Sequence, residues 1–290
     1  MSAEPGPHPD VVDQPLLDAL VKLLDIETLD DAAFLGASPE TSLQRVFGGQ
    51  VAGQALVAAG RTVDPERHVH SLHAYFIRPG DPSRPILYLV ENVRDGRSFS
   101  VRRVLAQQHG KTIFTLSASF QLPQPGFEHG ASVPEVPGPH EVPSLAELLA
   151  RGDAPPRFLS VPNPIDLRYL VPPWTSDTPR DDHRLWIKAK GVLPDDPLLH
   201  VCVATFASDF SLLESSLVRQ GRSWDRDEVV GASLDHAMWF HHPFRADEWV
   251  LYDTASPAAS GGRGLNEGRM FTADGVHAVT VLQEGMLRVR

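Results

Sequence analysis

Residues 47–63 read FGGQVAGQALVAAGRTV and contain a single charged side chain, that of Arg61. Apolar and small residues recur at helical spacing through the whole stretch. Gly and Ala have little or no side chain, so neighbouring elements can approach such a helix closely from every side. The stretch therefore predicts a long helix that is buried on almost all of its surface.

A series of short strands is expected after this helix. Each run is rich in Val, Ile, Phe, Tyr, Ser and Thr. Asp95-Gly96 and His109-Gly110 separate successive runs and are typical of hairpin turns. The runs are His70–Arg78, Ile86–Asn92, Ser98–Gln107 and Thr112–Gln121. The first half of the chain should thus form one helix and an antiparallel meander.

The second half repeats this order. Arg184–Lys190 alternates like a strand, and a helix should begin after Asp195-Asp196-Pro197 and run through LLHVCVATFASD. Further strands are expected at Val230–His242, Trp249–Ala255, Arg263–Thr272 and Val276–Leu287. The predicted fold class is therefore α+β in tandem, each half a long helix wrapped by a curved antiparallel sheet.

Proline divides the two halves. Ten of the 26 prolines lie between Pro123 and Pro164, where regular sheet cannot form. Ser144 and Glu147 are spaced as a capping box, so a short helix is expected at Ser144–Ala150. We expect a loose N-terminal tail at 1–15, a first domain at 16–122, a proline-rich linker at 123–164 and a second domain at 165–290.

Composition limits the partners of the chain. Lys and Arg number 26 against 37 Asp and Glu, a formal net charge of −11, and no basic cluster is present. Nucleic-acid binding is therefore not expected. The chain has no apolar run of the ~20 residues that cross a bilayer and no signal-peptide pattern at its N-terminus. The lone Cys202 fits a reducing compartment, so we expect a cytoplasmic protein without membrane insertion.

Few residues have a pattern that indicates chemistry. His70 and His73 point to opposite faces of a strand, so no metal site is expected. No serine-nucleophile elbow is present, and Cys202 lies mid-helix among apolar residues. Asp209, at the end of the second long helix, is either a general base with a raised pKa or an exposed or capping residue.

Ser233 and Gln283 stand in predicted strands of the same half as Asp209. An Asp, a hydroxyl and an amide can together hold one water molecule and accept its proton. Several longer motifs resemble the acyl-CoA thioesterase II family, over about Leu16 to Arg290. They include RVFGGQ (45–50), HAYFIRPGD (73–81), ASDF (207–210), LDHAMWFHHPF (234–244) and VLQEGMLR (281–288).

The resemblance implies a double hotdog fold and hydrolysis of fatty acyl-CoA thioesters to free fatty acid and CoA. Thioesters are electrophilic and the thiolate leaves readily, so we expect neither a metal nor a cofactor. The resemblance also implies that Asp209, Ser233 and Gln283 are catalytic, with Ser233 at a position where Thr is expected. Backbone N–H groups at Gly48 and Gly49 are candidates for the oxyanion site. Further candidate contacts to substrate are His73, Arg94, Arg97 and Arg263.

Alignment of the two long helices sets Ala59 against Asp209, so we expect one active site per pair of repeats. The alternative function is a non-hydrolytic acyl-CoA binding or sensing protein that uses the same cleft. A hotdog dehydratase is disfavoured because Phe47-Gly48-Gly49 offers no acid or base. Long strands with little charge at the sheet edges predict a homodimer or higher homo-oligomer.

Overall fold

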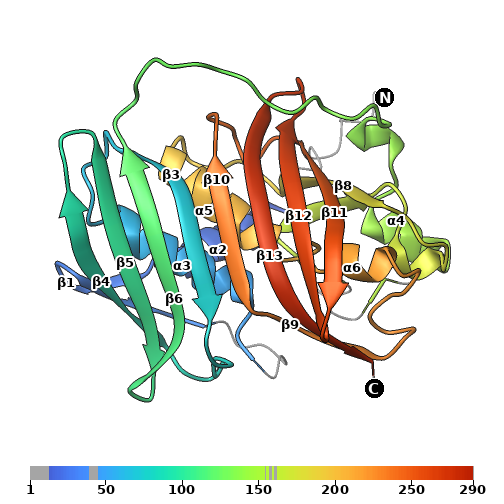
Figure 1. Cartoon of the computed structure of the whole chain (residues 1–290), viewed down its shortest axis with the longest axis horizontal. Helices are drawn as coiled ribbons and strands as arrows, with labels where there is room; N and C mark the ends of the chain where they lie inside the picture. The colour runs from blue at the N-terminus through green and yellow to red at the C-terminus, as the bar shows by residue number, and fades with distance from the viewer. Residues whose placement is uncertain (1–12, 39–44, 154, 157–158, 160–161, 290) are drawn as a thin grey trace, which may run out of the picture.

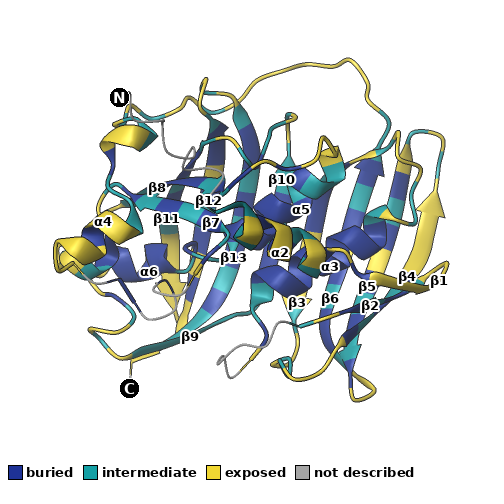
Figure 2. Cartoon of the chain, turned by 180° about the vertical axis from the view of Figure 1, so that it is seen from behind, coloured by how far each residue is buried: buried dark blue, intermediate teal, exposed yellow. Residues whose placement is uncertain are grey.

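The computed structural model describes residues 13–38, 45–153, 155–156, 159 and 162–289. Within them, thirteen strands form one antiparallel sheet, and the long helices pack on one of its faces (Figures 1 and 2). The strand order is β1-β2-β4-β5-β6-β3-β10-β13-β12-β11-β8-β7, and β9 pairs with β13. The predicted double hotdog, α+β and in tandem, is confirmed.

The described residues of the first half form two helices and six strands. They are α2 (Gln14–Leu24), β1 (Glu27–Asp30), β2 (Ala33–Gly36), α3 (Gly48–Gly60), β3 (His68–Phe76), β4 (Ile86–Asp95), β5 (Phe99–Gln108) and β6 (Lys111–Gln121). Between the halves lie η1 (Pro139–Glu141) and α4 (Leu145–Ala150). Ser144 caps α4 through the predicted capping box with Glu147.

The second half contains seven strands, two helices and a short 3₁₀ turn. They are β7 (Ile165–Tyr169), η3 (Pro173–Thr175), β8 (Asp182–Ala189), α5 (Pro197–Ser208), α6 (Glu214–Val218), β9 (Val229–Ser233), β10 (Asp235–Phe240), β11 (Val250–Ser260), β12 (Arg263–Thr272) and β13 (His277–Val289). The order β2-β4-β5-β6-β3 of the first half recurs as β8-β11-β12-β13-β10. The two halves join where β3 pairs with β10, with His73 opposite Ala237.

The two long helices lie side by side and antiparallel beneath the sheet. Every residue of α3 from Gly49 to Ala59 is buried, as the run of small residues predicts. A side chain on Gly53 would lie 3.3 Å from the carbonyl oxygen of Cys202 on α5, so the helix backbones approach closely. Gly49 at the start of α3 faces the carbonyl oxygen of Phe206 near the end of α5, and Gly60 at the end of α3 faces Leu198 at the start of α5, so the two helices run antiparallel. Figure 2 shows them next to each other on one face of the sheet.

The strand expected at Val230–His242 is wrong in one respect, because it is interrupted at Leu234. Ser233 pairs with Gly285, whereas Ala237 pairs with Leu282, so one extra residue is accommodated between them. Such a bulge reverses the alternation of side chains along a strand. It lets Ser233 and His236 face the same side of the sheet. The first half has a register shift at the matching place, between Val69 and Ser71.

The N-terminal tail was expected at 1–15. Residues 1–12 lie outside the described part, and residues 14 and 15 belong to α2 rather than to a tail. The linker passes over the outer face of the second half, where Val142 packs with Trp186, Leu251 and Phe271. Because one sheet runs through both halves, the division at 122 and 165 stays a prediction.

The sheet edges differ from expectation. The edge strands β1 and β7 have four and five residues, and β1 carries Glu27 and Asp30 on an exposed strand. Short, charged edges disfavour pairing with a second chain. The edge argument for self-association was therefore wrong. Among the described residues, no helix is both long and apolar enough to cross a membrane.

Candidate active site

Asp209 follows the last residue of α5 and lies at the first turn of α3. Its Oδ2 accepts the N–H of Gly49 at 2.9 Å. Its Oδ1 accepts Nε2 of Gln283 at 2.7 Å and the hydroxyl of Ser233 at 3.1 Å. The structure thus brings together the three predicted catalytic residues, which come from a helix end and two strands.

The junction of two helices explains why an acidic residue is tolerated here. The C-terminus of α5 alone would disfavour an anion, but the N-terminus of α3 favours one. The N-cap residue of α3, Phe47, makes no side-chain cap, so the carboxylate of Asp209 takes that place. The alternative interpretation of Asp209 was an exposed or capping residue. Asp209 does cap a helix, but this helix is α3 of the other half.

Glycine is required where α3 meets the carboxylate. A side chain on Gly48 would place its first carbon 2.6 Å from Oδ2 of Asp209. The predicted oxyanion role needs correction at Gly49, because its N–H already donates to Asp209. Gly48 remains the candidate donor. Rings of Phe47, Phe206 and Phe210 pack together beside this junction, with centroids 4.7–5.5 Å apart.

The surroundings hold the pKa of Asp209 above its ordinary value. Burial raises this pKa from 3.8, whereas the hydrogen bonds from Gln283, Ser233 and Gly49 oppose the shift. The positive charge of Arg45 also lowers the pKa slightly. A carboxylate with a raised pKa is a stronger base than a solvated one.

The positions of the first half that correspond to Asp209, Ser233 and Gln283 hold no polar side chain. Val69 stands ten residues before Pro79, as Ser233 stands ten before Pro243. Phe76 pairs with Phe114, and Phe240 pairs with Val279 in the same way. Ala118 lies four residues after Phe114, and Gln283 lies four residues after Val279, so Ala118 corresponds to Gln283. Ala59, Val69 and Ala118 are 0%, 7% and 1% exposed.

Leu198 occupies the space at that end of α3. A side chain on Gly60 would meet the methyl carbon Cδ2 of Leu198, whereas a side chain on Gly48 would meet the carboxylate of Asp209. The packing therefore supports one site per pair of repeats.

Two predicted substrate contacts lie on the other face of the sheet. Leu72 and Ala74 are buried toward the helices, so His73 between them points outward, where its ring packs on Trp239 at 5.1 Å. Arg263 is exposed and its Nε is bonded to Glu284 at 2.9 Å. Neither side chain is brought to Asp209.

Arg94 and Arg97 lie near the opposite end of α3. Arg102 donates to the carbonyl of Thr62, which follows α3, and to the carbonyl of Arg94. Thirteen residues of helix separate this region from Asp209, about 20 Å at 1.5 Å per residue. The structure therefore does not place these arginines at the site.

Sequence reasoning missed Arg45, although it begins the RVFGGQ motif. Its side chain is exposed and donates to the carbonyl of Gly231, two residues before Ser233, at 2.6 Å. Cys202 is buried, and burial raises its pKa, as expected of a core thiol. Among the described residues, no group of three His, Cys, Asp or Glu could hold a metal ion.

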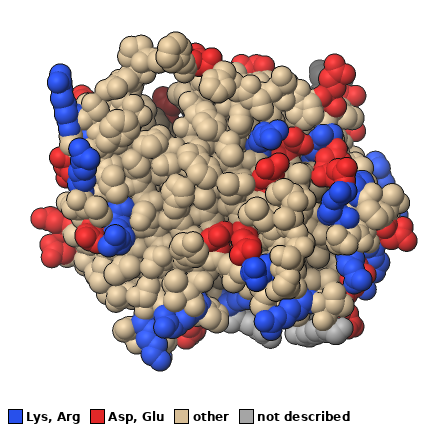
Figure 3. Space-filling model, in the orientation of Figure 1, with Lys and Arg blue, Asp and Glu red and all other residues tan. Residues whose placement is uncertain are grey.

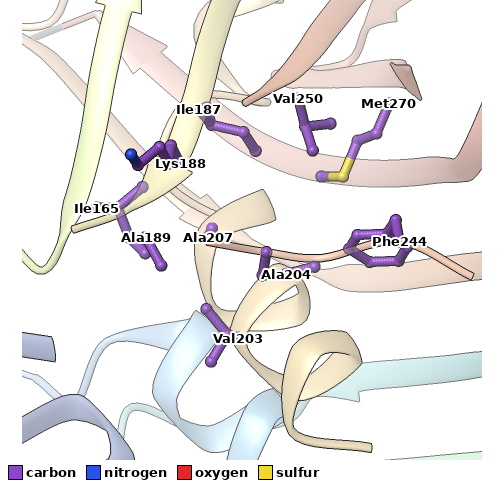
Figure 4. Close-up of a pocket in the computed structure, with 11 residues that line it drawn as sticks. Ile165, Ile187, Lys188, Ala189, Val203, Ala204, Ala207, Phe244, Val250 and Met270 are labelled. Atoms are coloured by element: carbon purple, nitrogen blue, oxygen red, sulfur yellow. The ribbon is translucent and has the colours of Figure 1, made fainter. Parts of the chain in front are cut away.

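Figure 4 shows a small pocket between α5 and the sheet. Its lining is almost wholly apolar. Val203, Ala204 and Ala207 contribute from α5, and Ile187, Phe244 and Met270 lie opposite.

Comparison with known proteins identifies the family. The acyl-CoA thioesterase profile matches residues 165–286, and the acyl-CoA thioesterase N-terminal domain profile matches residues 37–121. Human acyl-coenzyme A thioesterase 8 is 43% identical over 283 residues, covering 92% of this chain and 88% of the relative. Acyl-CoA thioesterase 2 of Haemophilus influenzae is 37% identical, covering 94% and 98%.

The crystal structure of an acyl-CoA thioesterase II from Mycobacterium marinum agrees with this. It superimposes with a TM-score of 0.78 at 42% identity and covers 93% of this chain and 98% of that one. The chain belongs to the acyl-CoA thioesterase family and is a thioester hydrolase, as its motifs predict.

Proposed function

We propose that the chain hydrolyses fatty acyl-CoA thioesters to free fatty acid and CoA, with Asp209 as general base. The observation that carries this proposal is the carboxylate at the start of α3, held by Gly49, Ser233 and Gln283. A carboxylate offers about four acceptor positions. Three are used here, which leaves one on Oδ2 for a proton of water.

In the proposed reaction, water bonded to Asp209 attacks the thioester carbonyl carbon while its proton passes to the carboxylate. The oxyanion is received by backbone N–H at the start of α3, for which Gly48 is the candidate. The C–S bond then breaks, and the CoA thiolate recovers the proton from Asp209. General-base assistance of this kind contributes on the order of 10²–10⁴-fold.

We propose a substrate contact from the position of a side chain relative to Asp209. Arg45 is exposed and lies near Asp209, so it is a better candidate for a CoA phosphate than Arg94, Arg97 or Arg263. An Arg45→Gln variant should raise KM more than it lowers kcat.

The test is release of free thiol from a panel of acyl-CoA esters by the parent and by Asp209→Asn. We expect turnover by the parent and a loss of at least ~100-fold in the variant, with the melting temperature retained. Binding without thiol release would favour the alternative, a non-hydrolytic acyl-CoA binding protein. Equal turnover in both proteins would refute the role of Asp209.

We also propose that the chain forms a homodimer or higher homo-oligomer in the cytoplasm. The middle of the outer sheet face is largely uncharged (Figure 3), and Tyr75 on it is 61% exposed. A face of this kind is suited to self-association. Light scattering should give a mass above 31.8 kDa that falls toward this value in Tyr75→Asp.

A further inference from the structure

His236 lies next to the proposed catalytic residues without bonding to Asp209. It is 1% exposed, and its Nε2 lies 2.9 Å from the hydroxyl oxygen of Ser208, the residue before Asp209. Ala237 pairs with Leu282, so one step along the strands His236 faces Gln283. Side chains at such opposed positions have Cβ atoms about 4.5–5.5 Å apart.

The hydrogen bonds of Ser208 define the tautomer of His236. We assign the one hydroxyl proton of Ser208 to the carbonyl oxygen of Thr205 at 2.9 Å, which is a stronger acceptor than Sδ of Met238 at 3.7 Å. With this assignment the oxygen of Ser208 accepts from His236, 2.9 Å away, so the proton of the imidazole lies on Nε2. Burial lowers the pKa of His236 to about 4, so the ring is neutral at neutral pH. Its Nδ1 is therefore an acceptor.

Two buried acceptors are left at this place. Within the described part of the chain, Nδ1 of His236 and Oε1 of Gln283 have no hydrogen-bond partner. A buried acceptor without a donor is unfavourable, because it has lost its hydrogen bonds to bulk water and gained none in return. One water molecule has two protons and can serve both atoms.

We propose that His236 is a positioning residue of the hydrolytic site, which shares a bound water with Oε1 of Gln283. The water holds the amide so that Nε2 of Gln283 faces Asp209 rather than Oε1, which the carboxylate would repel. Through Ser208, the same ring fixes the end of α5. This inference rests on the proposed function and adds a residue to it.

Two substitutions separate the two nitrogens. His236→Asn keeps a polar atom near the position of Nδ1, whereas His236→Gln keeps one near Nε2 and leaves Nδ1 unreplaced. We expect His236→Gln to lower kcat about tenfold with KM within about twofold, and His236→Asn to retain most of kcat. In a protein that already carries Gln283→Ala, His236→Gln should not lower kcat any further.

A measurement that needs no turnover accompanies the kinetics. The side-chain amide protons of Gln283, assigned by comparison with Gln283→Ala, should exchange slowly with solvent in the parent and in His236→Asn, and at least about tenfold faster in His236→Gln. The opposite ranking of the two variants, or no difference between them, would overturn the inference. A parent that releases no thiol would instead defeat the proposed function, and the exchange rates would still decide on His236.

Discussion

The two ends of α3 meet the same kind of surroundings but hold different groups. At its start, Gly48 faces the carboxylate of Asp209, with Ser233 and Gln283 bonded to that carboxylate. At its end, Gly60 faces Leu198, and the matching strand positions hold Val69 and Ala118. The strand bulge is present in both halves, between Val69 and Ser71 and again at Leu234.

The two halves share the same backbone arrangement, but only the second half carries the three side chains proposed to perform hydrolysis. The bulge turns a residue toward the helix end in either half, but only Ser233 has a hydroxyl there. Each half also depends on the other, because the N–H that holds Asp209 belongs to the helix of the first half. One half alone would therefore lack a complete site.

The largest expected effect comes from placing a carboxylate at the end of α3, where Leu198 fills the space. Ala59 is 0% exposed and has no counterpart of Ser233 or Gln283 beside it. An unpaired buried charge typically costs about 3–5 kcal/mol, so Ala59→Asp should lower the free energy of unfolding by this order. Urea unfolding measures it. Unchanged stability together with a doubled kcat would show that a carboxylate at the end of α3 is enough to form a second site, which would contradict this prediction.

Paired glycine substitutions compare the two helix ends directly. In Gly48→Ala the new methyl group lies 2.6 Å from Oδ2 of Asp209 and must displace the carboxylate. In Gly60→Ala it meets only the movable end of Leu198. Gly48→Ala should lower kcat about tenfold, whereas Gly60→Ala should leave kcat unchanged. Equal effects on thiol release would argue against the assignment of the site to one end.

The hydroxyl at the bulge should have a smaller effect. Ser233→Ala removes one of three donors to Asp209 and should lower kcat about five- to tenfold. Ser233→Thr keeps the hydroxyl and stiffens the side chain, so kcat should stay within about threefold of the parent. Steady-state kinetics with one acyl-CoA ester decides this. A Thr variant as slow as the Ala variant would mean that the pocket excludes the methyl group.

The pH dependence should show the smallest change. The reaction needs ionised Asp209, whose pKa is raised by burial, so kcat/KM should fall as pH decreases through a midpoint above 3.8. The hydrogen bond from Gln283 lowers this pKa. Gln283→Ala should therefore move the midpoint to higher pH. A midpoint that does not move, or moves down, would contradict the contact between these side chains.

Much of the fold could be predicted from the sequence for clear physical reasons. The charge-free run at Val51–Gly60 has only one stable place, inside a curved sheet, and α3 is buried accordingly. The dipeptide Asp95-Gly96 predicted the turn between β4 and β5. The capping box predicted a helix at Ser144–Ala150, and α4 begins one residue later, at Leu145, with Ser144 as its N-cap.

The site could be predicted only in part from the residues themselves. Asp209 was ambiguous because its stability depends on Gly49, 160 positions away. The bulge at Leu234 has no signal in composition, so the sequence predicts an uninterrupted strand through Ser233. The charges of Arg94 and Arg97 suit phosphate contacts, but sheet topology decides which end of α3 their hairpin reaches.

The central claim is that each chain has one hydrolytic site, at the start of α3. The most direct test is a calorimetric titration of the parent with a thioether analogue of a long-chain acyl-CoA, which cannot be hydrolysed. The account predicts one molecule bound per chain, with the same number for Asp209→Asn and weaker binding for Gly48→Ala. Two molecules bound per chain with equal affinity would contradict it.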